Sequence, residues 1–385
     1  MINVAALATF SVVSGTALAQ SSINLSGRID LGHSSIKTTP FEESSTKVTS
    51  FAGEQHGRTT SRLTFSGVED LGGGLRAAFN YETRLNPDNI DAAGMDRTRN
   101  MFLNLSGGFG AVTIGTYLNP FDTVRGFSAA TYSAPGGDFL ANHTNLASQV
   151  ITPEALAAEY IAAGVAANTA PSLAKLYLAL KGNGLSGRST NSIGYTTPSF
   201  GGFTASLGIS QEKTSTAETA LNKLEGVIGS LAYASGPLNA RLAVGEGKAS
   251  VKSTATNLSA SKTTDIAFAA SYDFGAAVPY FQYEKTKNTL SSFGGTTLTA
   301  VDGNVVKTAA AELGAKFPMG ALTPYITVSA GEFSFGGNDF DTSAFQIGTT
   351  YDLSKRTSLY AGAGQTKFDG FKKSNGYKIG LIHNF

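Results

Sequence analysis

The sequence predicts an all-β fold, a transmembrane antiparallel β-barrel of about 16 strands, and three observations lead to it. Beyond residue 19 the dominant period is two, which is the spacing of a strand with one apolar and one polar face. The segments with this period have the length that a tilted membrane strand needs. Short turns and longer polar connections alternate between them, as in a barrel with one short-looped rim and one long-looped rim.

The alternation of apolar and polar residues is clear at both ends of the chain. In 61–67, Leu63 and Phe65 alternate with polar neighbours, and in 375–385 Tyr377, Ile379, Leu381 and Phe385 do the same. About 16 segments of this kind are expected, at 22–36, 58–70, 74–86, 97–106, 110–118, 187–197, 201–212, 224–235, 238–250, 262–274, 277–288, 305–317, 321–334, 341–353, 356–368 and 375–385.

The connections between these segments are of two kinds. The short ones, such as "DLGGGL", "SGPL" and "PMGA", indicate tight turns. The long polar ones are expected at 37–57, 87–96, 213–223, 289–304 and 369–374, with a much longer connection at 119–186.

A soluble β-sandwich is the alternative to a barrel, since its strands alternate too. The second face of these strands carries Arg, Asn, Thr, Ser, Glu and Gly, which cannot pack as a dry core. A barrel avoids this problem, because its apolar face lies toward lipid and its polar face toward a water-filled interior. Closure of the sheet also removes the free hydrogen-bonding edges that lipid does not tolerate.

Composition narrows the class of protein further. The charges are balanced, with 29 Lys and Arg against 28 Asp and Glu, so bulk charge predicts no nucleic-acid partner. Cysteine is absent, which excludes disulfides, thiolate metal sites and a cysteine nucleophile together.

The N-terminal segment 1–19 is expected to be a signal peptide. Residues 5–13 form a short apolar core, and Ala17-Leu18-Ala19 has the small-residue pattern of a cleavage site. The segment is too short to span a bilayer as a helix. A buried apolar strand is the alternative. Export without cysteine suits the envelope of a Gram-negative bacterium.

The glycine triplet Gly72 to Gly74 raises the question of a phosphate-binding loop. A dinucleotide site needs a strand, then glycines, then a helix whose N-terminus holds the phosphates. The residues after Gly74 alternate with period two, so a strand follows instead. The triplet is therefore expected to be a tight periplasmic turn.

Several motifs in chain order carry a family resemblance. The stretches "SRLTFSGVEDLGGGLRAAFNYE", "FLNLSGGFGAVTIGTY" followed by "NPFD", "NSIGYTTPSFGGF", "YDLSKRTSLYAGAG" and "GLIHNF" resemble the general porins of β-proteobacteria over essentially the whole mature chain. The resemblance implies a homotrimer of 16-stranded barrels in the outer membrane. It implies that segment 119–186 folds inward as a constriction loop, and that segment 87–96 latches neighbouring subunits. Thr116 departs from the pattern, since many relatives carry Arg there.

The same resemblance makes Phe385 the signal read by the barrel-assembly machinery. Aromatic side chains near strand ends are expected to anchor the barrel at both membrane interfaces. These are Tyr81, Tyr117, Tyr233, Tyr280, Tyr351, Tyr360 and Phe385, with His383 as an interfacial ring at the rim.

The long connection 119–186 contains an alanine-rich stretch that reads as two short helices. Thr152 is a suitable N-cap, Pro153 suits the first helical position, and Gly182 suits the end of the second helix. A disordered insertion is the alternative. A loop of this length needs a functional role, and constriction of the lumen supplies one.

The candidate functional residues are charged groups expected to face the lumen. The wall cations that share the polar parity are Arg28, Arg62, Arg76, Arg84, Arg188, Arg241 and Lys378, with Lys378 expected near Arg28 because the first and last strands adjoin. The acids expected from the loop are Asp122, Asp138, Glu154 and Glu159. Acidic loop against basic wall creates a transverse field. The alternatives are that the cations neutralise lumen acids or bind lipopolysaccharide, and that the acids cap helices or fold the loop.

The sequence therefore predicts a water-filled channel for passive diffusion of small hydrophilic solutes and ions, with a mild anion preference. No catalytic residue, cofactor or metal site is expected, because the four histidines lie outside recognisable catalytic patterns. The expected partners are lipid, lipopolysaccharide, the assembly machinery and two further copies. The alternatives are a substrate-specific channel with a site built by the enlarged loop, and a barrel hydrolase or adhesin.

Overall fold

The structure is a computed structural model, and it describes residues 22–41, 44–51, 59–86, 95–130, 185, 187–216, 220–253, 256–293, 296–297, 305–335, 338–368 and 373–385. The expected signal peptide at 1–19, the latch at 87–94 and the two helices within 152–182 lie outside these residues.

One short helix and a set of long strands make up the described chain. In order, they are β1 (Ser22–Phe41), β2 (Ser44–Phe51), β3 (Arg62–Gly72), β4 (Leu75–Leu85), β5 (Met95–Gly107), β6 (Gly110–Leu118), α1 (Pro120–Arg125), β7 (Arg188–Thr196), β8 (Phe203–Thr216), β9 (Ala220–Ser235), β10 (Leu238–Ser253), β11 (Thr256–Tyr272), β12 (Val278–Phe293), β13 (Thr296–Thr297), β14 (Val305–Lys316), β15 (Leu322–Phe335), β16 (Asn338–Asp352), β17 (Thr357–Phe368) and β18 (Ser374–Asn384).

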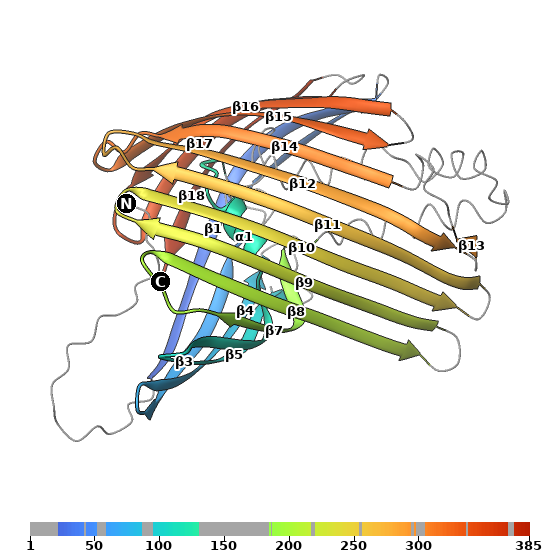
Figure 1. Ribbon diagram of the computed structural model, residues 1–385. Helices are drawn as coiled ribbons and strands as arrows, with labels where there is room; N and C mark the ends of the chain where they lie inside the picture. The colour runs from blue at the N-terminus through green and yellow to red at the C-terminus, as the bar shows by residue number, and fades with distance from the viewer. Residues whose placement is uncertain are drawn as a thin grey trace.

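The strands form a closed antiparallel barrel, as predicted (Figure 1). Each strand pairs with its neighbours in sequence, and β1 pairs with β18 from Arg28↔Asn384 to Lys37↔Asn375, which closes the sheet. β2 and β3 continue one another along the same side of β1, and the two-residue β13 extends the hairpin of β12 and β14. The 18 strand segments therefore make a 16-stranded barrel.

Among the described residues, no helix combines the length and the apolar character needed to cross a membrane.

The long connections are shorter than the sequence analysis expected. Segment 37–57 was expected to be a loop, but β1 continues to Phe41 and β2 returns from Ser44 to Phe51. Likewise β8 reaches Thr216 and β12 reaches Phe293, whereas β17 ends at Phe368 as predicted. These expectations were wrong because the outer parts of the strands are rich in Ser, Thr and Lys. The ladder hydrogen bonds come from the backbone, so a strand can continue where the alternation of apolar and polar residues ends.

The two faces of the barrel have the inverted polarity that the sequence predicts. Apolar side chains on the outer face are exposed, including Leu103 at 66% and Leu313 at 56%. Polar side chains on the inner face are buried, including Gln282 at 0% and Gln346 at 3%. The alternation is continuous along β14, where exposed and buried positions follow one another with period two.

Three of the tyrosines expected at the membrane interface, Tyr117, Tyr280 and Tyr360, lie inside the barrel instead. Tyr280 is 3% exposed and Tyr360 is 6% exposed. Their hydroxyls are hydrogen-bonded within the lumen, since Tyr280 donates to Glu312 and Tyr360 donates to Asp30. The expectation was wrong because position near a strand end does not determine which face a ring occupies. Tyr81, Tyr351 and Phe385 are exposed.

Each of three inner tyrosines lies over a glycine on the next strand. The pairs are Tyr280 over Gly314, Tyr325 over Gly348 and Tyr360 over Gly380, and each pair is directly opposite in the strand register. A Cβ at Gly314 would lie 2.3 Å from the Tyr280 hydroxyl. Glycine thus lets a large ring lie flat on the wall.

The glycine triplet forms a tight turn between β3 and β4, as predicted. Gly72, Gly73 and Gly74 all have positive φ, at 83°, 61° and 81°, which residues with a Cβ rarely adopt. The Gly72 amide donates to Asp70 Oδ1 at 2.9 Å, and a strand begins at Leu75. No helix follows, so the triplet lacks the geometry of a phosphate loop.

Replacement of Gly314 with Ala tests the tyrosine–glycine contact. We expect the free energy of unfolding to fall by about 1–3 kcal/mol, because the methyl group overpacks against the Tyr280 ring. Urea unfolding of the refolded barrel measures it. The double variant Tyr280→Ala/Gly314→Ala should lose less than the sum of the single variants. Additive losses would contradict the contact.

Candidate functional site

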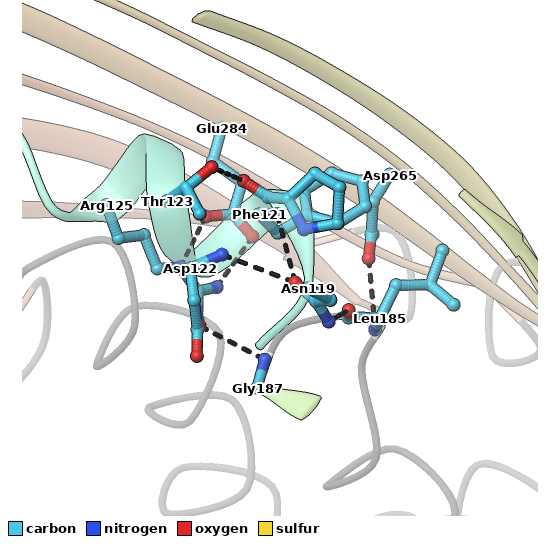
Figure 2. A network of polar contacts seen from close by, with 10 residues as sticks. Asn119, Phe121, Asp122, Thr123, Arg125, Leu185, Gly187, Asp265 and Glu284 are labelled. Atoms are coloured by element: carbon cyan, nitrogen blue, oxygen red, sulfur yellow. Dashed lines mark hydrogen bonds and ion pairs between the residues drawn. The ribbon is translucent and has the colours of Figure 1, made fainter. Parts of the chain in front are cut away.

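The connection from β6 to β7 enters the lumen through helix α1, whose start is fixed by the sequence N-P-F-D (Figure 2). Asn119 caps the helix, since its Oδ1 accepts from the amides of Phe121 at 2.9 Å and Asp122 at 3.3 Å. Pro120 occupies the first turn, where it has no amide to lose. The Asn119 amide group also donates to the Leu185 carbonyl.

The helix packs on the inner wall formed by β9, β10 and β11, through apolar side chains. Phe121 and Val124 are 0% and 1% exposed. They share a cluster with Ile228 and with the small residues Ala243, Ala267 and Ala269. Gly245 also faces Phe121, and a Cβ there would lie 3.1 Å from its ring. Small wall residues therefore make the recess that the helix fills.

Two buried carboxylates on the wall hold the segment after Phe121. Arg125 forms a bidentate contact with Glu284 on β12, with Nε–Oε2 at 2.8 Å and Nη2–Oε1 at 2.6 Å. Glu312 on β14 accepts from the hydroxyls of Ser128 at 2.5 Å and Tyr280 at 2.8 Å. The Tyr280 hydroxyl in turn accepts from the Ala129 amide. Helix α1 and the residues after it are therefore fixed to the wall at several points.

The opposite wall carries a row of arginines at one level of the barrel. The strand register places Arg28 opposite Arg62, Arg62 opposite Arg84, and Arg84 opposite Arg97. These four positions lie on β1, β3, β4 and β5, and the Arg97 side chain lies outside the described part. The Arg28 guanidinium donates to Asn384 Oδ1 at 2.8 Å.

A single glutamate lies among three arginine side chains, of which only Arg62 belongs to this row. Glu82 contacts Arg99 at 2.6 Å, Arg62 at 3.4 Å and Arg188 at 3.6 Å. The side chain of Glu82 is 10% exposed, whereas that of Arg62 is 32% exposed. One carboxylate thus meets three guanidinium groups, which leaves the wall positive. We call Arg62, Glu82, Arg99 and Arg188 the arginine cluster.

The arginine row and helix α1 face each other across the lumen. Counted around the closed barrel, β3 is the second of the 16 spanning strands and β11, beneath the helix, is the tenth. Seven strands lie between them in either direction, so they are half the circumference apart. A solute that crosses the barrel at this level therefore passes between the two.

The structure separates two predicted cations from the row. Arg76 is exposed beside the turn, opposite Asp70, and lies eight residues from Arg84, which is about 27 Å along a strand. Lys378 is opposite Ser34, six residues along β1 from Arg28, and is buried close to Asp30. The expectation that Lys378 lies near Arg28 was wrong, because the register of β1 and β18 places Lys378 nearer the long-loop rim.

Arg241 lies on the inner face of β10, with its guanidinium carbon 6.0 Å from the centre of the Phe127 ring. It therefore stands on the helix side of the lumen and not with the row.

Asp122 joins the two ends of the connection and lies between cations. Its Oδ1 accepts from the Gly187 amide at 3.1 Å and lies 3.7 Å from the Arg125 guanidinium. Burial raises the pKa of the Asp122 carboxyl above its usual range, and the nearby Arg125 and Arg188 charges oppose that rise. The other predicted loop acids, Asp138, Glu154 and Glu159, lie outside the described residues.

Several charged residues of this site were not identified from the sequence. Glu82 has the lumen parity and could have been found by it, as could the helix start at N-P-F-D. The pairing of Arg125 with Glu284 joins residues 159 positions apart. No local pattern contains that contact, since it depends on how the helix docks.

Neither a metal centre nor a catalytic triad stands out in the described part of the chain. It contains no group of three or more His, Cys, Asp or Glu residues placed to hold an ion. His383 contacts Thr357 at 2.9 Å on the exposed rim, and no carboxylate bonded to that ring is described.

A closed 16-stranded barrel with an apolar outer face and a charged, partly obstructed lumen defines a channel protein of a bacterial outer membrane. The model of the Gram-negative porin family matches residues 4–370. The chain therefore belongs to the Gram-negative porin family, and it forms a water-filled pore for passive diffusion of small hydrophilic solutes and ions.

Known proteins resemble the chain over most of its length. Outer membrane porin protein 32 of Delftia acidovorans is 31% identical over 350 residues, which covers 90% of this chain and 84% of that protein. An outer membrane porin protein of Bordetella pertussis is 27% identical and covers 100% of this chain and 99% of that protein.

Solved structures show the same fold. The anion-selective porin from Comamonas acidovorans superposes with a TM-score of 0.66 at 25% identity, covering 95% of this chain and 100% of that one. A loop-deleted form of OmpT, an outer membrane protein of Vibrio cholerae, has a TM-score of 0.64 at 14% identity and covers 95% and 99%. The predicted fold, family and location are thereby confirmed.

Replacement of Glu284 with Gln tests how helix α1 is held. We expect the free energy of unfolding to fall by about 3 kcal/mol, because the buried Arg125 loses its bidentate carboxylate and keeps only the more distant Asp122. Urea unfolding measures this, and planar-bilayer recordings should show a larger or noisier single-channel current. The exposed outer carboxylate Glu225 gives the matched control Glu225→Gln, which should behave as wild type. Equal behaviour of the two variants would contradict the docking role.

Proposed function

We propose that this porin is mildly anion-selective, and that the arginine cluster and the arginine row determine the selectivity. The observation that carries the proposal is the contact of one carboxylate, Glu82, with three guanidinium groups. Arg28 and Arg84 add positive charge at the same level of the wall. Such a wall attracts anions to this level of the lumen and repels cations.

Two acids of the helix side have arginine neighbours of their own. Glu284 is occupied by Arg125, and Asp122 lies between Arg125 and the Arg188 side chain. The negative charge of these two carboxylates is therefore partly offset where they lie. The solved porin from Comamonas acidovorans, which shares 25% identity with this chain, carries the description anion-selective. That description supports the same sign of selectivity here.

Further parts of the proposal come from the sequence and the family. We propose that 119–186 as a whole is the constriction loop, that 1–19 is removed after Ala19, and that the mature chain forms a homotrimer. Phe385 at the end of the last strand is proposed to be read by the barrel-assembly machinery, and lipopolysaccharide is the proposed lipid partner. The pore catalyses no reaction in this proposal.

Opposite changes of charge within the arginine cluster should move selectivity in opposite directions. Arg62→Gln should lower the anion-to-cation permeability ratio by about twofold, and Glu82→Gln should raise it by about as much. A unit charge about 10 Å from the path changes the energy of an ion by ~0.4 kcal/mol in water. The reversal potential across a salt gradient in a planar bilayer measures the ratio.

Arg76→Ser is the control for this experiment, because it removes the same charge beside the turn, away from the row. It should change the ratio less than Arg62→Gln. A wild-type reversal potential of the cation-selective sign would overturn the proposal, as would equal effects of the two arginine variants.

The raised pKa of Asp122 predicts a pH dependence. An ordinary Asp side chain titrates near 3.8, so Asp122 takes up its proton at a higher pH as the solution is acidified. Protonation removes a negative charge from the lumen, and anion preference should therefore rise on acidification from neutral pH. In the variant Asp122→Asn the side-chain oxygen can still accept the hydrogen bond from the Gly187 amide. The variant should lack the part of the rise in anion preference that comes from protonation of Asp122. Identical pH profiles for variant and wild type would contradict it.

A further inference from the structure

The outer face of the barrel carries a group of lysines just beyond the apolar band. On β12, the outward residues Phe281 and Tyr283 are followed toward the long-loop rim by Lys285 and Lys287. On β14, Leu313 and two alanines are followed by Lys307. These three lysines are exposed, and we call them the lysine triad. Strands β12 and β14 lie side by side on one flank of the barrel (Figure 1).

The strand register brings the triad together. Lys287 is directly opposite Lys307, and Lys285 lies two residues along β12 on the same face. Opposed side chains in an antiparallel pair have Cβ atoms about 5 Å apart, and like charges in that position repel. Within the described part of the chain no carboxylate forms an ion pair with any of the three. The sheet therefore holds three cations around one point, and no ion pair to them is present among the described residues.

A second pair of lysines on the same flank shows how the chain satisfies this geometry elsewhere. Lys248 on β10 is directly opposite Lys262 on β11. Glu246 lies between them, 3.1 Å from the Lys248 ammonium and 2.7 Å from that of Lys262. The same cross-strand arrangement thus has its own carboxylate in one case and lacks it in the other. The comparison indicates that the triad takes its anion from outside the chain.

We propose that the lysine triad binds a phosphate group of a phosphorylated outer-leaflet lipid, with the acyl chains of that lipid lying on the apolar band below. The position fits this occupant. Short turns mark the periplasmic rim, so the triad lies at the outer interface, where headgroup phosphates meet the hydrocarbon. Lysine stems can lie along apolar surface while the ammonium reaches the headgroup layer. The exposed Phe268, Phe281 and Leu313 supply that surface.

The proposal rests on the lipopolysaccharide partner proposed above and on the outer face being embedded in a membrane, and not on the ion selectivity of the lumen. Its failure is therefore distinguishable from failure of the anion-selective channel. The triad points away from the pore, so its variants should leave the reversal potential unchanged.

The test uses the full chain, refolded in a non-ionic detergent, with diphosphorylated lipid A as the probe and native mass spectrometry as the readout. The variant Lys285→Gln/Lys287→Gln/Lys307→Gln should retain the lipid at least about tenfold more weakly than wild type, because three cations near an anionic lipid surface each contribute. Heat-modifiable migration on a denaturing gel checks that both barrels are folded.

The control variant Glu246→Gln/Lys248→Gln/Lys262→Gln removes two lysines from the same flank without leaving a carboxylate unpaired. It should bind lipid A as wild type does. Equal affinity of wild type and triad variant would overturn the proposal. Equal losses of lipid A affinity in the triad and control variants would also overturn it, because the loss would then not be specific to the triad. Undiminished binding of dephosphorylated lipid A would do the same, because the phosphate would then not be recognised.

Discussion

Inside a lipid bilayer, every backbone N–H and C=O group must find its hydrogen-bond partner within the protein, because hydrocarbon offers none. This chain meets the requirement by pairing β1 with β18, so that no strand edge remains along the seam. Closure then forces the second face of each strand to line an interior too wide to fill with side chains. The polar parity of the sequence and the water-filled lumen both follow from that one geometric requirement.

The interior is selective because one segment of chain returns into it. Wall residues as small as Ala243, Ala267 and Gly245 leave a recess, and Phe121 fills it. The Arg125–Glu284 pair then fixes the helix opposite the arginine row. Packing and charge therefore act together: the apolar recess sets where the helix lies, and the arginine wall sets which ions pass beside it.

Much of the fold could be predicted from the sequence, because alternation, turn glycines and strand length are local properties. The same parity placed Arg28, Arg62 and Arg84 on the polar face, and register then aligned them. Register itself was not predictable, so Lys378 could not be separated from the row, whereas the eight residues between Arg76 and Arg84 on one strand could have separated Arg76. The direction of Tyr280 was also missed, since its hydroxyl partners, Ala129 and Glu312, come from distant parts of the chain.

The alignment of Arg28, Arg62 and Arg84 at one level has a consequence for transport kinetics. Cations spaced along the pore would form successive binding positions, and a permeating anion would move from one to the next. Cations gathered at one level form a single binding site, which one anion occupies at a time. Flux through such a site saturates as the anion concentration rises, because each anion must leave before the next can enter.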